Sequence, residues 1–126
     1  MRPTVLIVDD SPSTAHLARL ALSGVRCEVE VAPSAECALA YLHDWLRPNL
    51  MVIDANLPGV QASSFLQDVR TAVPWAPVVL LLDRGMVVPQ LLSVSAQLFK
   101  PLQPRRLRSV VSQLIVPRGE DAAADA

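Results

Sequence analysis

Four charged residues could take part in the same chemistry: Asp9, Asp10, Asp54 and Lys100. Each of them lies at the end of an apolar run or just after it. Three carboxylates packed together repel one another, so a metal ion or the Lys100 ammonium group is needed beside them. Mg²⁺ prefers carboxylate, water and phosphate oxygens, and a carboxylate held beside it can attack a phosphoryl group. This chemistry would make Asp54 the nucleophile, Asp9 and Asp10 the metal ligands, and Lys100 the contact to the phosphoryl oxygens.

Whether these residues meet depends on the apolar runs that precede them. Residues 50–53 are four large hydrophobes in a row, which are too few for a helix and typical of a strand buried on both faces. Pro58-Gly59 then turns the chain. In an open parallel sheet, ligands bind where the carboxyl ends of the strands meet, so Asp54 is expected at that edge. Similar strands are predicted at 4–8, 27–32, 77–82 and around 98–99, of which 27–32 alternates in polarity like a strand near the sheet edge.

Helix signals alternate with these strands. Ser11-Pro12 and Pro33-Ser34 begin the first two helices, a third runs from residue 63 or 64 to 72, and Pro104 begins the last. In the first helix, Leu17, Leu20 and Ala21 are predicted to face the core. Residues 86–95 are the least regular stretch, in which Pro89 could begin a helix of about two turns but forbids a long one. Five strands alternating with five helices, the fourth of them short or irregular, predict an α/β fold with a parallel sheet covered on both faces.

Composition limits the classes of function that remain. The chain has 126 residues, which fits one domain, and 11 basic and 12 acidic residues, for a net charge of -1. This balance gives no electrostatic reason to expect direct binding of nucleic acid or of an anionic membrane. The two cysteines lack metal-ligand spacing and are expected to be reduced thiols in a soluble cytoplasmic protein. His16 and His43 fall on predicted helices, away from the carboxylates, and are expected to be structural.

Residues 1–116 resemble the receiver domains of two-component response regulators. The matching motifs, in the order and context of that family, are Val8-Asp9-Asp10, Asp54 with Asn56-Leu57-Pro58-Gly59, and Lys100-Pro101. The resemblance implies a flavodoxin-like, doubly wound five-stranded sheet of order 2-1-3-4-5. It also implies phosphorylation of Asp54 by a sensor histidine kinase or phosphotransfer protein, and a metal ligand from the Asn56 backbone carbonyl. Residues 117–126 are expected to be a disordered acidic tail or linker.

The chain departs from the family where phosphorylation is usually converted into a signal. The fourth strand normally ends in Ser or Thr followed by a small residue, whereas Leu82-Asp83 stands here. Leucine cannot donate a hydrogen bond to a phosphoryl group, and Asp83 adds a fourth negative charge near it. The aromatic residue usual three positions before the lysine is Gln97. Both halves of the usual switch are therefore expected to be absent.

Three readings of function follow from these observations. The leading one is a receiver domain that accepts phosphate at Asp54 with Mg²⁺ and signals through protein contacts with a nonstandard switch, without being an enzyme beyond its own phosphorylation. The second is a receiver-shaped interaction module whose output does not depend on phosphate. The third, a metal-dependent phosphohydrolase, is weakened because Asn56 stands where a second carboxylate would act as the acid and base. The sequence names neither the kinase nor the output partner, and fits both a protein that functions alone and a piece of a longer one.

Overall fold

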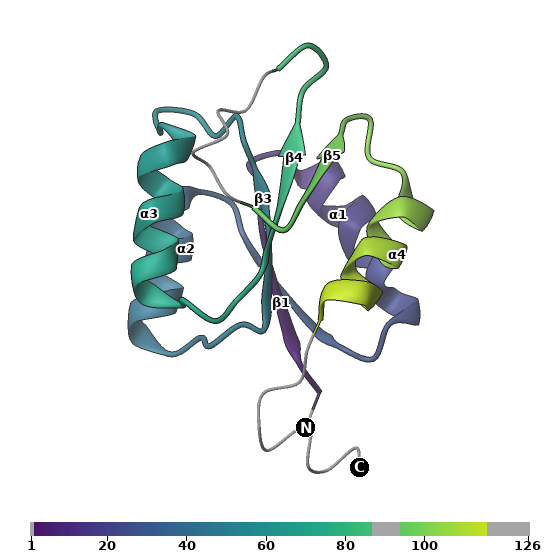
Figure 1. Cartoon of the computed structure of the whole chain (residues 1–126), viewed down its shortest axis with the longest axis horizontal. Helices are drawn as coiled ribbons and strands as arrows, with labels where there is room; N and C mark the ends of the chain where they lie inside the picture. The colour runs from purple at the N-terminus through teal and green to yellow at the C-terminus, as the bar shows by residue number, and fades with distance from the viewer. Residues whose placement is uncertain (1, 87–93, 116–126) are drawn as a thin grey trace.

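A five-stranded parallel sheet forms the centre of the molecule in the computed structural model, which describes residues 2–86 and 94–115 (Figure 1). The strands lie in the order β2-β1-β3-β4-β5. Their bounds are β1 Thr4–Val8, β2 Glu28–Ala32, β3 Leu50–Asp54, β4 Val78–Leu82 and β5 Ala96–Phe99. All four neighbouring pairs are parallel. The fold class and the strand order predicted from the sequence are confirmed.

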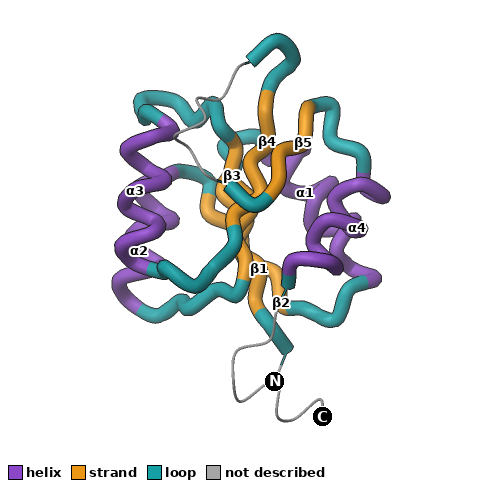
Figure 2. The backbone as a smooth tube through the Cα atoms, viewed as in Figure 1, coloured by secondary structure: helices purple, strands orange, loops and turns teal. Residues whose placement is uncertain are grey.

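Helices cover both faces of this sheet (Figure 2). Their bounds are α1 Pro12–Ala21, extended by the 3₁₀ turn η1 Leu22–Gly24, α2 Ala35–Asp44, α3 Ala62–Ala72 and α4 Pro104–Leu114. α2 and α3 lie on one side, and α1 and α4 on the other (Figure 1). The short fourth helix predicted within 86–95 falls mostly on residues 87–93, and the predicted tail on 117–126, both outside the described residues. Within the described ranges, no helix has the length and apolar character needed to cross a membrane.

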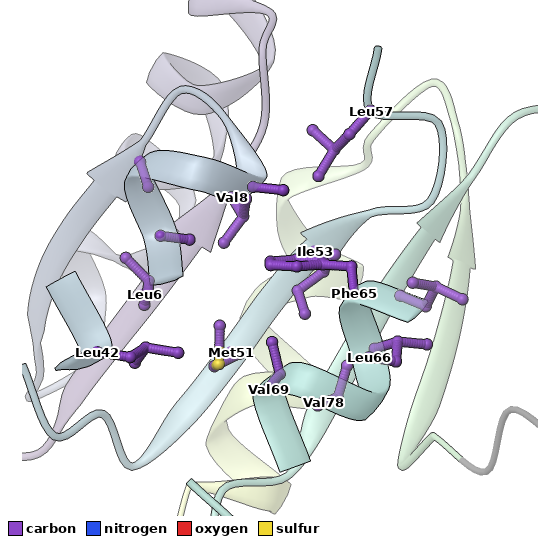
Figure 3. Packing of buried hydrophobic residues seen from close by; sticks show 14 of the residues in the cluster. Leu6, Val8, Leu42, Met51, Ile53, Leu57, Phe65, Leu66, Val69 and Val78 are labelled. Carbon is purple, nitrogen blue, oxygen red and sulfur yellow. The ribbon is translucent and has the colours of Figure 1, made fainter. Parts of the chain in front are cut away.

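The alternation of side chains along β3 explains why the sheet needs helices on both faces. Met51 and Ile53 belong to the apolar cluster under α2 and α3, whereas Leu50 and Val52 belong to the cluster under α1 and α4. Figure 3 shows part of the first cluster, with Met51, Ile53 and Phe65 among its members. All five residues of β3 are buried. Since each such apolar side chain contributes about 1.5–3 kcal/mol on burial, β3 is held firmly in the middle of the sheet.

The predicted serine cap at Ser11 is confirmed, and the predicted start of the second helix at Pro33-Ser34 also has a serine cap. The Ser11 hydroxyl accepts a hydrogen bond from the Thr14 N–H at 3.3 Å, at the start of α1. The Ser34 hydroxyl accepts one from the Cys37 N–H at 3.0 Å, at the start of α2. These caps fix where each helix begins, immediately after the loops that follow β1 and β2.

The predicted core face of α1 is wrong in one position. Leu20 is 53% exposed, and the residues of α1 that are buried are Ala15, Ala18 and Ala21. Leu20 lies two positions after Ala18, about 200° around the helix, and so points away from the sheet. The close contact is made by small residues, which a pattern weighted toward large hydrophobes does not detect.

Candidate functional site

The predicted charged residues lie together at the carboxyl ends of β1, β3 and β5. Val8 pairs with Ile53 in register, so Asp9 and Asp54 follow neighbouring positions of adjacent strands. One carboxylate oxygen each of Asp9, Asp10 and Asp54 lies within 4.8 Å of the others. The Lys100 Nζ lies 3.1 Å from Asp54 Oδ2. The structure therefore places all four residues in one cluster, which we call the pocket, while their chemical roles stay predictions.

Both oxygens of Asp54 are fixed by hydrogen bonds. Oδ1 accepts from the backbone N–H of Asn56 at 3.0 Å, and Oδ2 accepts from Lys100 at 3.1 Å. The side chain of Asp54 is 3% exposed. Further along the same loop, the chain turns at Gly59, which adopts a φ of 72° that residues with a side chain rarely take. Asp54 is therefore held in a single orientation, with little access to bulk water.

Asp9 has an oxygen without a partner. Its Oδ1 accepts from the Ser11 N–H at 2.8 Å, but its buried Oδ2 has no hydrogen-bond partner in the described part of the chain. Burial raises the pKa of Asp9, the Ser11 N–H lowers it, and the charge of Asp54 raises it again, with a net increase. A buried polar atom without a partner costs about 1–3 kcal/mol, so this oxygen favours a positively charged neighbour.

The donor set fits a magnesium ion. Asp9 and Asp54 are buried, whereas Asp10 is exposed and leaves one side of the cluster open to water. A few carboxylates with several waters are the environment that Mg²⁺ prefers. A cation at this place would supply the missing partner of Asp9 Oδ2 and offset the repulsion among the carboxylates. Asn56, whose backbone carbonyl the family resemblance implies as a further ligand, lies in the loop that follows β3.

Lys100 keeps its charge in this pocket. Its side chain is 23% exposed, and burial alone would lower the pKa of its ammonium group. The hydrogen bond to Asp54 and the charges of Asp54, Asp9 and Asp83 act in the opposite direction, and the net pKa is raised above its ordinary value. At neutral pH, the pocket therefore holds a positive charge beside Asp54.

The three predicted switch positions have very different environments. Leu82 is 1% exposed and packs in the core under α2 and α3, and Gln97 is exposed on β5. Asp83, directly after β4, lies at the rim of the pocket, with 46% of its side chain exposed. Its Oδ2 accepts from Asn56 Nδ2 at 3.0 Å, and its Oδ1 lies 3.8 Å from Lys100 Nζ. The expected fourth carboxylate is therefore present at the rim, where it contacts Asn56 and Lys100.

One histidine lies closer to the carboxylates than predicted. His16 lines an open hollow together with Asp9, Asp10 and Arg19, between α1 and the end of β2. α1 begins at Pro12, two positions after Asp10, so residues 12 and 16, one turn apart, both line this hollow. His43 is exposed in the last turn of α2.

Comparisons with known proteins agree with this geometry. The family model described as response regulator receiver domain matches residues 5–112. The DNA-binding response regulator MtrA of Mycolicibacterium smegmatis is 30% identical over 129 residues, covering 99% of this chain and 55% of that protein. The transcriptional regulatory protein TrcR of Mycobacterium tuberculosis is 34% identical over 84 residues, covering 67% of this chain and 32% of that protein. The chain thus spans about half the length, or less, of these relatives.

Solved structures show the same fold. The chemotaxis response regulator CheY4 of Vibrio cholerae has a TM-score of 0.78 at 24% identity, covering 90% of this chain and 99% of that one. A CheY-like response regulator receiver domain protein of Methanospirillum hungatei has a TM-score of 0.80 at 20% identity, covering all of both chains. At these identities, the likeness concerns the arrangement of helices and strands alone.

Proposed function

This chain belongs to the family of response regulator receiver domains. On that basis, we propose that its Asp54 accepts a phosphoryl group from a phosphohistidine donor. Receiver domains are signalling proteins of two-component systems. One observation carries the proposal for this chain: the buried Asp54, with both oxygens hydrogen-bonded, lies 3.1 Å from the chain's only lysine and beside Asp9 and Asp10. A fixed nucleophile next to a positive charge is the arrangement that phosphoryl transfer needs.

The transfer step uses groups that are already in position. A carboxylate oxygen of Asp54 attacks the phosphorus, an O–P bond forms, and the P–N bond to the donor imidazole breaks. The imidazole keeps the electron pair and takes up a proton. Lys100 offsets negative charge on the phosphoryl oxygens, and the Asn56 N–H orients the attacking carboxylate.

The cofactor proposed for this step is Mg²⁺. Asp9, Asp10, Asp54 and the backbone carbonyl of Asn56 would hold it, and the unpartnered Oδ2 of Asp9 supports a cation at this place. When bound, the ion supplies positive charge to the transferring phosphoryl oxygens. Asp10, which is exposed, would keep the ion in contact with water.

The proposed partners are a sensor histidine kinase or phosphotransfer protein on the input side and an unidentified protein on the output side. The printed names of MtrA and TrcR describe DNA binding or transcriptional regulation, but those are statements about proteins that this chain matches over about half their length or less. The net charge of -1 gives no overall electrostatic attraction to nucleic acid. Signalling through protein contacts therefore remains the proposal for the chain itself.

A second candidate is an interaction module whose output is independent of phosphate. It is favoured by the switch positions, because Leu82 is buried without a hydroxyl and Asp83 already lies beside Lys100. Binding of the output partner should then be equal for the wild type and Asp54→Asn. A large difference in affinity between the two would remove this candidate.

The test of the first candidate is uptake of phosphate from acetyl phosphate with Mg²⁺, followed by intact-mass measurement. The wild type should gain one phosphate, and Asp54→Asn should gain none. Asp44→Asn, which changes an exposed aspartate at the end of α2, is the matched control and should behave as the wild type. No adduct from acetyl phosphate or from a panel of histidine kinases, or an adduct retained in Asp54→Asn, would contradict the proposal.

A further inference from the structure

The mouth of the pocket is bridged by a side chain that the transfer step does not use. Asp83 accepts a hydrogen bond from the side-chain amide of Asn56, at 3.0 Å, and its other oxygen lies 3.8 Å from Lys100 Nζ. We call these two contacts the rim bridge. It connects the loop after β3, the end of β4 and the end of β5, which are the segments that surround Asp54.

Backbone contacts hold Asp83 at this position. The Lys100 N–H donates to the carbonyl of Leu82 at 2.8 Å, which places Asp83 and Lys100 at neighbouring strand ends. The Asp83 carbonyl accepts from the Met86 N–H at 3.1 Å, closing a turn in which Gly85 has a φ of 81°. Asp83 therefore belongs to a hydrogen-bonded turn at the rim, with one carboxylate oxygen near Asn56 and the other near Lys100.

Lys100 is shared between two carboxylates. It lies 3.1 Å from Asp54 and 3.8 Å from Asp83, so the pocket and its rim hold four carboxylates beside one ammonium group. An incoming phosphoryl group carries about two negative charges and needs the same ammonium group. The three N–H donors of a lysine can contact several oxygens, but its single positive charge is already offset.

We propose that Asp83 is an internal anion that competes with the incoming phosphoryl group for Lys100 and the Asn56 side chain, and so slows phosphate uptake at Asp54. The inference rests on the proposed function of Asp54 and adds a regulating residue to that site. Asp83 acts as a positioning residue, because it works through Lys100 and Asn56. Phosphoryl uptake then requires that the rim bridge opens.

Competition by Asp83 for Lys100 can be distinguished experimentally from a merely structural role of Asp83. Removal of the Asp83 charge favours an incoming anion, which is then repelled less and competes with one carboxylate fewer for Lys100. The same removal disfavours Mg²⁺, because the pocket becomes less negative. Phosphate uptake and Mg²⁺ affinity should therefore change in opposite directions, whereas damage to the pocket would lower both.

The experiment compares the wild type, Asp83→Asn, Asp83→Ala and the control Asp44→Asn, each checked for cooperative thermal unfolding. Asp83→Asn keeps the size of the side chain and an oxygen for Asn56, and Asp44→Asn makes the same change of net charge on the exposed end of α2. Phosphate uptake from acetyl phosphate at saturating Mg²⁺ is followed by intact mass, and Mg²⁺ binding by calorimetry. Both Asp83 variants should take up phosphate faster, on the order of tenfold, and bind Mg²⁺ about two- to fivefold more weakly. Should Asp83→Asn not fold, Asp83→Ala carries the comparison.

The outcomes separate this inference from the function on which it rests. Equal uptake rates for the wild type and the folded Asp83 variants, or slower uptake together with weaker Mg²⁺ binding, overturn the inference and leave Asp54 as the phosphate acceptor. Uptake by the Asp83 variants alone, with none by the wild type, supports both. No uptake by any variant overturns both.

Discussion

Lys100 carries the charge balance of the pocket, since it is the only lysine of the chain and contacts both Asp54 and Asp83. Asp54 is 3% exposed, so the loss of Lys100 would leave a buried carboxylate with one partner fewer. The interaction is charge-assisted and partly buried, the class that contributes most among hydrogen bonds. Removal of the interaction between Lys100 and Asp54 should therefore change both the free energy of unfolding and the affinity for Mg²⁺.

We predict that Lys100→Ala lowers the free energy of unfolding by roughly 1–3 kcal/mol in the absence of Mg²⁺. The same variant should bind Mg²⁺ more tightly than the wild type, because the cation replaces the lost ammonium charge, and should take up phosphate more slowly. Denaturant unfolding with and without Mg²⁺ measures the first effect and calorimetry the second. Lys100→Arg, which keeps the charge, is the control. Unchanged Mg²⁺ affinity in Lys100→Ala would contradict the charge balance described here.

The two cysteines should differ in reactivity. Cys27 is 8% exposed, and burial, reinforced by the charge of Glu28, raises the pKa of its thiol, so that less of the reactive thiolate is present near pH 8. Cys37 is half-buried on α2. Iodoacetamide should label Cys37 first and Cys27 only after unfolding, as measured by peptide mapping. Rapid native labelling in Cys37→Ser would show that Cys27 is more accessible than the structure indicates.

At the scale of the elements, the strands could be predicted because each is a short apolar run ending on a charge or a turn. β3 and β4 are buried along their whole length, which matches the unbroken runs in the sequence. The face of α1 could be predicted only in part: Ala21 and the half-buried Leu17 face the core as predicted, but Ala15 and Ala18 also make the contact and the larger Leu20 points outward. The rule that large hydrophobes face the core fails where a helix packs closely through small residues.

The Ser34 cap gives a test of how the local sequence fixes an element. We predict that Ser34→Ala lowers the free energy of unfolding by about 1 kcal/mol, since the Cys37 N–H at the start of α2 loses its acceptor. Ser112→Ala, on an exposed position of α4, should change stability by less than about 0.5 kcal/mol. Denaturant midpoints measure both. Equal effects of the two substitutions would mean that the cap does not determine the start of α2.

At the scale of the whole molecule, the topology assembles the site. Order β2-β1-β3-β4-β5 brings Asp9, Asp54 and Lys100 to one edge although they are separated by up to 91 positions of sequence. This convergence could be predicted, because parallel strands share their carboxyl edge. The bond between Asp83 and Asn56 could not, since it depends on the rotamers of two side chains in loops, which no spacing in the sequence records.

Mg²⁺ should stabilise the whole fold, because a ligand that binds only the native state raises the free energy of unfolding by mass action. At a concentration about 100 times the dissociation constant, the gain is about 2.7 kcal/mol. We predict that Asp10→Ala, which removes an exposed member of the acidic cluster, abolishes most of this gain, whereas Asp44→Ala keeps it. Thermal unfolding with increasing Mg²⁺ measures the effect. A melting temperature independent of Mg²⁺ in the wild type would contradict a metal site in this pocket.

In the proposed function, the buried carboxylate of Asp54 becomes the acyl phosphate. Borohydride reduces an aspartyl phosphate to homoserine, so treatment of the phosphorylated protein followed by peptide sequencing in the mass spectrometer locates the modified residue. We predict homoserine at position 54 and unchanged aspartate at positions 9, 10 and 83. Homoserine at any of those three positions, or at none while phosphate is bound, would contradict it.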